Sequence, residues 1–492
     1  MKPRSTIYWH DYEAFGANAR RDRASQFAGI RTDLELNEID EPLVIYCQPA
    51  PDYLPHPQAC LITGITPQLA MQQGLPETDF IRRIHEQISR PGTCTAGYNN
   101  IRFDDELSRQ LLYRNFYDPY EREWKNGNSR WDIIDMLRLC YAVRPEGIQW
   151  PDGDRGGPSF RLELLSAAND ISHEDAHDAL SDVRATIALA KLVKQVQPKL
   201  YDYAFDMRLK KQVQSVIDLE RRKPLVHVSA MYPASRGSSA IVMPLVRHPL
   251  DNNGVLFYDL QTDPSPWLSQ SEEEMRASLF TPREQRAADE IRLPVSVVHI
   301  NRSPMLAPLP VMTTERMKFL GFDLATARRH WHLIHEHPDF VRRLTLAMQG
   351  GAEADADDDP DFMIYSGGFF SEADKRLMTR IRSMDAVQLA DQSSAVSNAF
   401  LDARLPELLF RYRARNFPQT LSVAEKQRWQ DLCRRRLLPE APDAGSPAGL
   451  TATQCLEQVK ALSEEPGLTE SDRHVLDELQ EWVQAICEHL AK

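Results

Sequence analysis

The chain lacks any cysteine pattern that would hold zinc or build a disulfide framework. None of its seven cysteines, which are scattered over 492 residues, belongs to a Cys-x-x-Cys pair. An odd, unpatterned set indicates reduced thiols, as in the cytosol. The N-terminus has no apolar core of a signal peptide, and no apolar run approaches the roughly 20 residues that span a membrane. We therefore expect a soluble, cytoplasmic protein without a membrane partner.

An excess of positive charge is also missing. The 58 Lys and Arg residues are outnumbered by 71 Asp and Glu, which gives a formal net charge of −13. This excludes a general polybasic coat for nucleic acid, although a local basic groove remains compatible with it because phosphates respond to the nearby potential. The chain contains no Walker loop, no GxGxxG loop and no internal repeat. Its length predicts about two to four domains.

What is present near the N-terminus is a pair of acids on a predicted strand. Asp11 and Glu13 stand two positions apart in the apolar and aromatic segment 7–16. Alternate residues of a strand point to the same face, so the two carboxylates project side by side. Buried carboxylates repel one another and lose hydration, and a hard divalent cation such as Mg²⁺ relieves both costs. The pair alone fits a solvated sheet edge about equally well.

Residues 1–197 alternate strand-like and helix-like segments, which predicts an α/β domain. We expect helices to open at Thr66-Pro67 and at the cap residue Thr78. Further strands are expected at 30–34, 43–47 and 94–97, and further helices at 104–115 and 175–195.

The pattern changes after Pro198. Short strands are expected at 224–228, 241–243, 255–258 and 295–300, which predicts a small β-barrel or sheet domain with added helices over 198–350. The acidic run within 351–361 predicts a solvated linker. Residues 362–492 are helical by pattern.

Three further side chains are suited to complete the acidic pair. Asp104 stands at a predicted helix start, and His177 precedes Asp182 by five positions. At about 100° per residue these two do not share one helix face, so His177 must lie at or before the helix start. Two cations about 3.5–4 Å apart clamp the oxygens of a phosphodiester, and a histidine suits the activation of water.

These motifs resemble the DEDDh exonucleases, and more closely the bacterial exonuclease I family. The resemblance rests on His10-Asp11-Tyr12-Glu13, on Gly97 to Glu106, and on the spacing of His177 and Asp182. It extends over nearly the whole chain through segments 115–120, 159–163, 223–229 and 410–418. The acidic linker and the insert 441–450 are not matched.

The family implies a ribonuclease H-like exonuclease domain (1–197), an SH3-like β-barrel domain (198–350), a linker (351–361) and an all-helical C-terminal domain (362–492). The implied activity is processive 3′→5′ degradation of single-stranded DNA to 5′-mononucleotides, in DNA repair and recombination. The implied cofactor is Mg²⁺, as two ions, with Mn²⁺ as a substitute. The implied partner is the acidic tail of single-stranded DNA-binding protein, and we expect a monomer.

The same resemblance assigns roles to residues. Asp11, Glu13 and Asp182 would bind metal, Asp104 would complete the acidic set, and His177 would be the general base. Glu13 and Arg161 would contact the terminal nucleotide. The DNA path would be lined by Arg109, Tyr120, Trp124 and Arg138, and the pocket for the acidic tail by Arg144 and Lys223.

Plainer interpretations stand beside these. Asp105 and Asp178, adjacent to the chosen acids, are typical of helix starts. Arg109 and Arg138 fit surface arginines, and Tyr120 and Trp124 fit core aromatics. The basic residues between 202 and 236 fit either a phosphate track or a solvated face. Arginines of segment 411–415 fit either a nucleic-acid face or pairing with the acidic linker.

Two rival functions follow. The first is a DEDDh exoribonuclease or oligonucleotidase, although such enzymes usually manage with the catalytic domain alone. The second is a nuclease-dead scaffold that binds single-stranded DNA, although all five predicted catalytic side chains are present.

Overall fold

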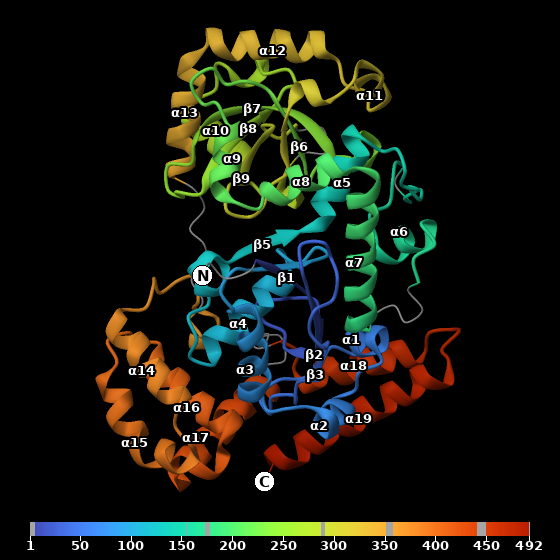
Figure 1. The fold of residues 1–492 in the computed structure, drawn as a ribbon. Helices are drawn as coiled ribbons and strands as arrows, with labels where there is room; N and C mark the ends of the chain where they lie inside the picture. The colour runs from blue at the N-terminus through green and yellow to red at the C-terminus, as the bar shows by residue number, and fades with distance from the viewer. Residues whose placement is uncertain are drawn as a thin grey trace. The chain divides into compact units, whose positions relative to one another are not determined.

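The computed structural model describes residues 5–154, 156–172, 178–286, 291–350, 358–439 and 449–491. These residues form two compact units (Figure 1). The first unit combines residues 1–129, 174–184 and 356–492, and the second combines 130–173 and 185–355. Among the residues so described, no helix has both the length and the apolar character needed to cross a membrane.

The sheet of the first unit is built around β1 (Thr6–Ala14), the strand that carries the acidic pair. β1 pairs antiparallel with β2 (Ala24–Thr32) and parallel with β4 (Thr93–Gly97), and β2 pairs antiparallel with β3 (Leu43–Tyr46). Ile7 and Trp9 of β1 are fully buried. The predicted buried strand is therefore confirmed, and the sheet is mixed.

Most of the predicted helices of this region form where expected. α2 (Pro67–Gln73) begins after Thr66, whose hydroxyl accepts a hydrogen bond from the Leu69 N–H at 3.1 Å. α3 (Glu77–Ile88) begins before Thr78, with Pro76 at the cap position, so the predicted Thr78 cap is wrong. The remaining helices are α1 (Pro57–Thr63), α4 (Asp104–Arg114) and α7 (Ala179–Val196).

The second unit begins within β5 (Ser129–Asp132) and contains an antiparallel sheet in the order β10-β6-β7-β8-β9. The four predicted strands are present, while the short β10 was not predicted. The strands are β6 (Leu225–Val228), β7 (Ser239–Arg247), β8 (Gly254–Asp259), β9 (Val295–His299) and β10 (Leu306–Pro308). The helices are α5 (Ile133–Val143), α6 (Leu162–Ala168), α8 (Pro198–Asp206), α9 (Lys210–Val216), α10 (Glu272–Phe280), α11 (Thr314–Phe319), α12 (Leu324–Glu336) and α13 (Pro338–Gln349).

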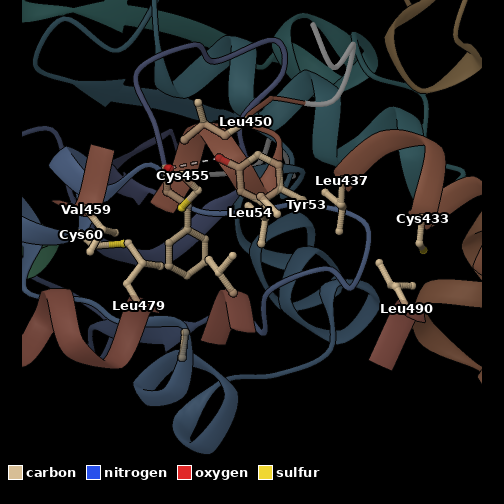
Figure 2. Close-up of a cluster of buried hydrophobic side chains, with 14 of the residues drawn as sticks. Tyr53, Leu54, Cys60, Cys433, Leu437, Leu450, Cys455, Val459, Leu479 and Leu490 are labelled. Carbon is tan, nitrogen blue, oxygen red and sulfur yellow. Dashed lines mark hydrogen bonds between the residues drawn. The ribbon is translucent and has the colours of Figure 1, made fainter. Parts of the chain in front are cut away.

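The C-terminal region is helical, as predicted. Its helices are α14 (Glu372–Arg382), α15 (Ala386–Ala399), α16 (Leu405–Asn416), α17 (Val423–Leu437), α18 (Ala452–Ser463) and α19 (Glu470–Ala491). Helices α18 and α19, red in Figure 1, lie against α1. Figure 2 shows the core that results, in which Tyr53 and Leu54 pack among side chains from α17 to α19. All seven cysteines are free.

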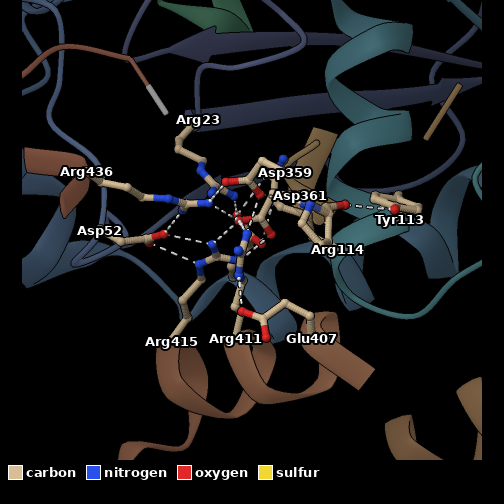
Figure 3. A network of polar contacts seen from close by, with 12 residues as sticks. Arg23, Asp52, Tyr113, Arg114, Asp359, Asp361, Glu407, Arg411, Arg415 and Arg436 are labelled. Atoms are coloured by element: carbon tan, nitrogen blue, oxygen red, sulfur yellow. Dashed lines mark hydrogen bonds and ion pairs between the residues drawn. The ribbon is translucent and has the colours of Figure 1, made fainter. Parts of the chain in front are cut away.

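A buried network of arginines and carboxylates also joins the C-terminal helices to the N-terminal part of the first unit (Figure 3). Asp361, which is fully buried, pairs with Arg411, Arg415 and Arg436 at 2.9, 2.5 and 2.9 Å. Asp52 pairs with Arg415 at 2.8 Å and also with Arg436. Burial alone would raise the pKa of Asp361, but the arginines hold it well below its usual range.

This network corrects one prediction and decides another. The acidic linker is not solvated at its C-terminal end, because Asp359 also pairs with Arg411 and Arg436. Segment 411–415 is therefore not a nucleic-acid face. Arg411 and Arg415 pair with the end of the linker, and Tyr412 is buried against Phe116, as the plainer interpretation expected.

Replacing Asp361 with Asn is expected to lower the free energy of unfolding by about 3–5 kcal/mol, because buried arginine charges lose their partner. Denaturant unfolding measures this. The matched control is Asp431→Asn on α17, where the side chain is 45% exposed and pairs with Arg434 at 3.5 Å. The control should change the free energy by less than about 1 kcal/mol.

The same variant has a defined pH dependence. Because the pKa of Asp361 is lowered by folding, its stabilisation is present above the unfolded carboxyl pKa of about 4 and is lost as pH falls further. The gap in stability between wild type and Asp361→Asn should therefore narrow below about pH 4. A gap that stays constant would contradict the ion-pair assignment.

Candidate functional site

Three carboxylates from distant parts of the chain meet on one face of the first sheet. Asp11, Glu13 and Asp182 each place one carboxylate oxygen within 4.8 Å of the other two. Asp11 and Glu13 come from the same face of β1, and Asp182 comes from the first turn of α7. The structure therefore brings together the three predicted metal ligands.

Asp104 lies close to this group without being one of the three. It is the first residue of α4, it is 3% exposed, and its Oδ1 accepts a hydrogen bond from the Tyr12 N–H at 3.0 Å. Its charge raises the pKa of both Asp11 and Glu13. Asp104 thus adds negative potential to the site that the sequence predicted.

The electrostatics of the cluster favour a bound cation. Burial raises the pKa of Asp11 well above its usual value, and Asp104, Glu13 and Asp182 raise it further. Burial, followed by Asp182 and Asp104, raises the pKa of Glu13 to about 9. Protons or cations must neutralise such a group at neutral pH. An all-oxygen donor set fits a hard divalent cation.

The two neighbouring acids have structural roles. Asp178 accepts hydrogen bonds from the Ser181 N–H and from the Gln26 amide, both at 3.2 Å, and so caps the start of α7. Gln26 in turn accepts the Ala179 N–H at 3.1 Å. Asp105 forms a fully buried ion pair with Arg122 at 2.7 Å. Gln26 holds α7 to the sheet, and nothing in the sequence pattern marks it for that role.

The predicted base, His177, lies outside the described residues. The described part of α7 begins at Ala179, which is compatible with a histidine before the helix start. The role of His177 therefore stays a prediction from the sequence.

Three predicted DNA-contact residues lie in the first unit. Arg109 is 8% exposed, donates to Glu123 at 2.7 and 3.0 Å, and lies 5.5 Å from the Tyr120 ring centre. Trp124 is 65% exposed and is therefore not a core aromatic. Its exposure is compatible with stacking on a base, and DNA contact by these residues stays a prediction.

Two aromatic residues beside them were missed by the sequence analysis. The Tyr365 hydroxyl accepts a hydrogen bond from Arg109 at 3.2 Å. Phe369 is 85% exposed and its ring meets that of Tyr120 edge to face at 5.6 Å. The adjacent Phe370 is buried. The Phe-Phe pair was a visible signal, but the sequence does not tell which of the two faces solvent.

The other predicted contacts belong to the second unit. Arg138 is buried and pairs with Asp135 at 2.6 Å, whereas the Arg161 side chain is 67% exposed and pairs with Glu163 at 2.7 Å. Arg144 donates to the Val311 carbonyl at 2.8 Å. Lys223 is exposed and lies 3.5 Å from Asp218. These positions leave the predicted roles in nucleotide and tail binding untested.

Three family models together match most of the chain. The model described as "Exonuclease" matches residues 8–190, the "Exonuclease I SH3-like domain" matches 208–348, and the "Exonuclease I C-terminal domain" matches 358–486. The first of these contains the whole acidic cluster.

Similar proteins of known identity cover nearly the same span. The chain is 47% identical to exodeoxyribonuclease I of Escherichia coli over 89% of its own length and 91% of that protein. It is 48% identical to the solved exonuclease I of Methylocaldum szegediense, with a TM-score of 0.91 over 98% and 99% of the two chains. The zinc-bound complex of E. coli exonuclease I with single-stranded DNA is 42% identical, with a TM-score of 0.91 over 98% and 100%. The chain therefore belongs to the exonuclease I family, and its metal-dependent exonuclease fold is shared with those structures.

Proposed function

We propose that this chain is a processive 3′→5′ exonuclease that degrades single-stranded DNA to 5′-mononucleotides, with a role in DNA repair and recombination. The observation that carries the proposal is the convergence of Asp11, Glu13 and Asp182 on one face of the first sheet. Membership of the exonuclease I family, in which a relative is solved with single-stranded DNA and a metal ion, supports it.

We assign Asp11, Glu13 and Asp182 as ligands of two Mg²⁺ ions, which Mn²⁺ can replace. Such ions, when bound, lower the pKa of water and stabilise charge on the oxygens of an in-line displacement. The all-oxygen set and the raised pKa values of Asp11 and Glu13 support a hard divalent cation.

Other side chains position the ligand-bearing strand, the attacking water and the terminal nucleotide. Asp104 holds the Tyr12 backbone at 3.0 Å and so fixes α4 to the strand that bears the ligands. His177 takes a proton from the attacking water, a role suited to an imidazole near neutral pH. Glu13 and Arg161 contact the terminal nucleotide.

We assign contact with the single-stranded DNA to four residues: Arg109, Tyr120, Trp124 and Arg138. Exposed aromatics stack on bases without sequence preference, which suits an enzyme that degrades any single strand. Tyr365 and Phe369 extend the aromatic surface beside Tyr120. The proposal keeps the domain boundaries at 197, 350 and 361. Processivity would arise because the domains enclose the single-stranded DNA.

Arg144 and Lys223 are proposed to bind the acidic tail of single-stranded DNA-binding protein. The exposed ammonium group of Lys223 supports a role in binding an acidic peptide. A monomeric, cytoplasmic enzyme completes the proposal.

The rival functions differ in measurable ways. An exoribonuclease would cleave single-stranded RNA faster than DNA of the same sequence. A nuclease-dead scaffold would bind an oligonucleotide yet release no mononucleotides with Mg²⁺ or Mn²⁺. Either result would overturn the proposal.

The metal-free protein should have a stability that depends on pH through Glu13. Because the pKa of Glu13 is raised to about 9, the folded state keeps a proton that the unfolded state loses near pH 4.3. Stability should therefore fall as pH rises from about 4.3 towards 9 in EDTA, and Mg²⁺ should remove that fall. Thermal unfolding against pH measures it, and Glu13→Gln should flatten the EDTA curve.

Asp182 should be needed for hydrolysis but not for DNA binding. Asp182→Ala is expected to lower mononucleotide release by about 100-fold or more, since even the partners of metal ligands cost 10–100-fold. Affinity for a single-stranded oligonucleotide should stay within a few-fold, because the residues assigned to DNA contact are unchanged. Asp202→Ala, an exposed position on α8, is the control. An equal loss of binding would make Asp182 a structural residue.

Binding of the acidic tail should be separable from hydrolysis. Arg144→Ala or Lys223→Ala should weaken binding of an acidic peptide while hydrolysis of a free oligonucleotide is unchanged. Fluorescence anisotropy of a labelled peptide and a nuclease assay separate the two effects. Parallel loss of both would argue against a separate pocket.

A further inference from the structure

Gln26 lies beside the acidic cluster, on the strand next to β1. It is the direct cross-strand partner of Glu13, so the two side chains lie on the same face of the sheet. Gln26 is 2% exposed. Because a buried amide needs hydrogen-bond partners within the protein, the partners that it finds indicate what the residue does.

Both ends of this amide hold the start of α7. The Gln26 Oε1 accepts a hydrogen bond from the Ala179 N–H at 3.1 Å, and the Nε2 donates to Asp178 Oδ1 at 3.2 Å. Asp178 uses its other oxygen, Oδ2, to accept the Ser181 N–H at 3.2 Å. Asp178 is thus shared between the helix that it caps and the strand. We call these contacts of Gln26, Asp178, Ala179 and Ser181 the Gln26 clasp.

One turn of helix connects the clasp to Asp182, the ligand that α7 supplies. The Asp182 N–H donates to the Asp178 carbonyl at 3.1 Å. At the other end of the clasp, the pairing of β1 with β2 connects Gln26 to Glu13. The Gln26 clasp therefore links the two ligands Glu13 and Asp182, although Gln26 supplies no carboxylate of its own.

Repulsion between these two ligands acts against the clasp. After burial, the charge of Asp182 contributes most to the raised pKa of Glu13. Like charges therefore push the first turn of α7 away from β1. A neutral amide can oppose this with two directional hydrogen bonds and adds no further charge. A carboxylate at this position would add to the repulsion, and an apolar side chain would form neither bond.

We propose that Gln26 is a positioning residue of the exonuclease site, which sets the affinity for the divalent cation by holding Asp182 at its distance from Glu13. This role rests on the proposed function and deepens it. Gln26 acts through Asp178 and Ala179. Supporting contacts must hold such a site to within about 0.5 Å of its working geometry, and their loss typically lowers metal affinity or activity about 10- to 100-fold.

Gln26→Met removes both hydrogen bonds and nearly keeps the length of the side chain. Without DNA, the Kd for Mn²⁺, measured by EPR titration, should rise about 10-fold. Hydrolysis of oligo(dT) at limiting Mn²⁺ should slow by a similar factor, and saturating Mn²⁺ should recover most of the loss. The KM for the oligonucleotide should stay within about twofold. In the metal-free protein, amide hydrogens at the start of α7 should exchange faster.

Gln68→Met is the matched control. Gln68 lies on α2 in the same unit, and its Nε2 donates to the Glu478 carbonyl of α19 at 2.5 Å. It also joins a helix to another element, and it is not part of the acidic cluster. Its loss should shift the denaturant midpoint about as much as Gln26→Met, while the Kd for Mn²⁺ stays unchanged. The comparison separates lost positioning from lost stability.

A pair of substitutions exchanges the two ends of the clasp. Gln26→Glu brings two carboxylates together, and Asp178→Asn removes one acceptor, so each alone should speed amide exchange at Ala179 and Ser181. In the double variant the amide at position 178 can donate to the carboxylate at position 26, and the net charge is that of the wild type. Slow exchange and hydrolysis should then be partly recovered, which is a non-additive result. A double variant that shows the sum of the two single losses would overturn the inference.

The outcomes separate this role from the proposed function. An unchanged Kd for Mn²⁺ in Gln26→Met overturns the inference, as does a rise that Gln68→Met matches or unchanged exchange at the start of α7. If the wild-type protein binds Mn²⁺ but releases no nucleotides, and Gln26→Met weakens that binding, the proposed function fails and the role of Gln26 stands. If the wild-type protein hydrolyses DNA and Gln26→Met behaves like it, the reverse holds.

Discussion

Mutual repulsion among buried carboxylates is the constraint on which the site depends. Asp11 and Glu13, whose charge burial already disfavours, approach Asp104 and Asp182. The surrounding structure keeps them there by hydrogen bonds to the backbone of β1 and to the start of α7, including those of Asp104 and Gln26. A divalent cation turns this costly arrangement into a favourable one, so binding and chemistry arise from the same geometry.

Local pattern was enough to predict the elements that position this cluster. The strand bearing Asp11 and Glu13, the helix start at Asp104 and the first-turn place of Asp182 all follow from short-range periodicity and spacing. The Thr78 cap was wrong because Pro76 occupies the cap position instead. A proline with fixed φ competes with a hydroxyl there, and propensity alone does not decide between them.

Long-range pairing was harder to predict than the elements. The acidic run before residue 362 looks solvated in sequence, yet Asp359 and Asp361 are paired with Arg411, Arg415 and Arg436. The outward turn of Phe369 and the position of His56 next to Asp22 have the same origin. Each depends on a partner far along the chain or on a loop conformation. The hydrophobic periodicity of a short segment predicts neither of these.

Pairing across such distances has a consequence for synthesis on the ribosome. Asp52 is buried with Arg415 and Arg436, which follow it by 363 and 384 positions. At about 5–20 residues per second, translation delivers these arginines roughly 20–80 s later. Until then Asp52, in the turn after β3, lacks these two arginine partners. The nascent chain therefore completes its first unit only after the intervening second unit has left the ribosome.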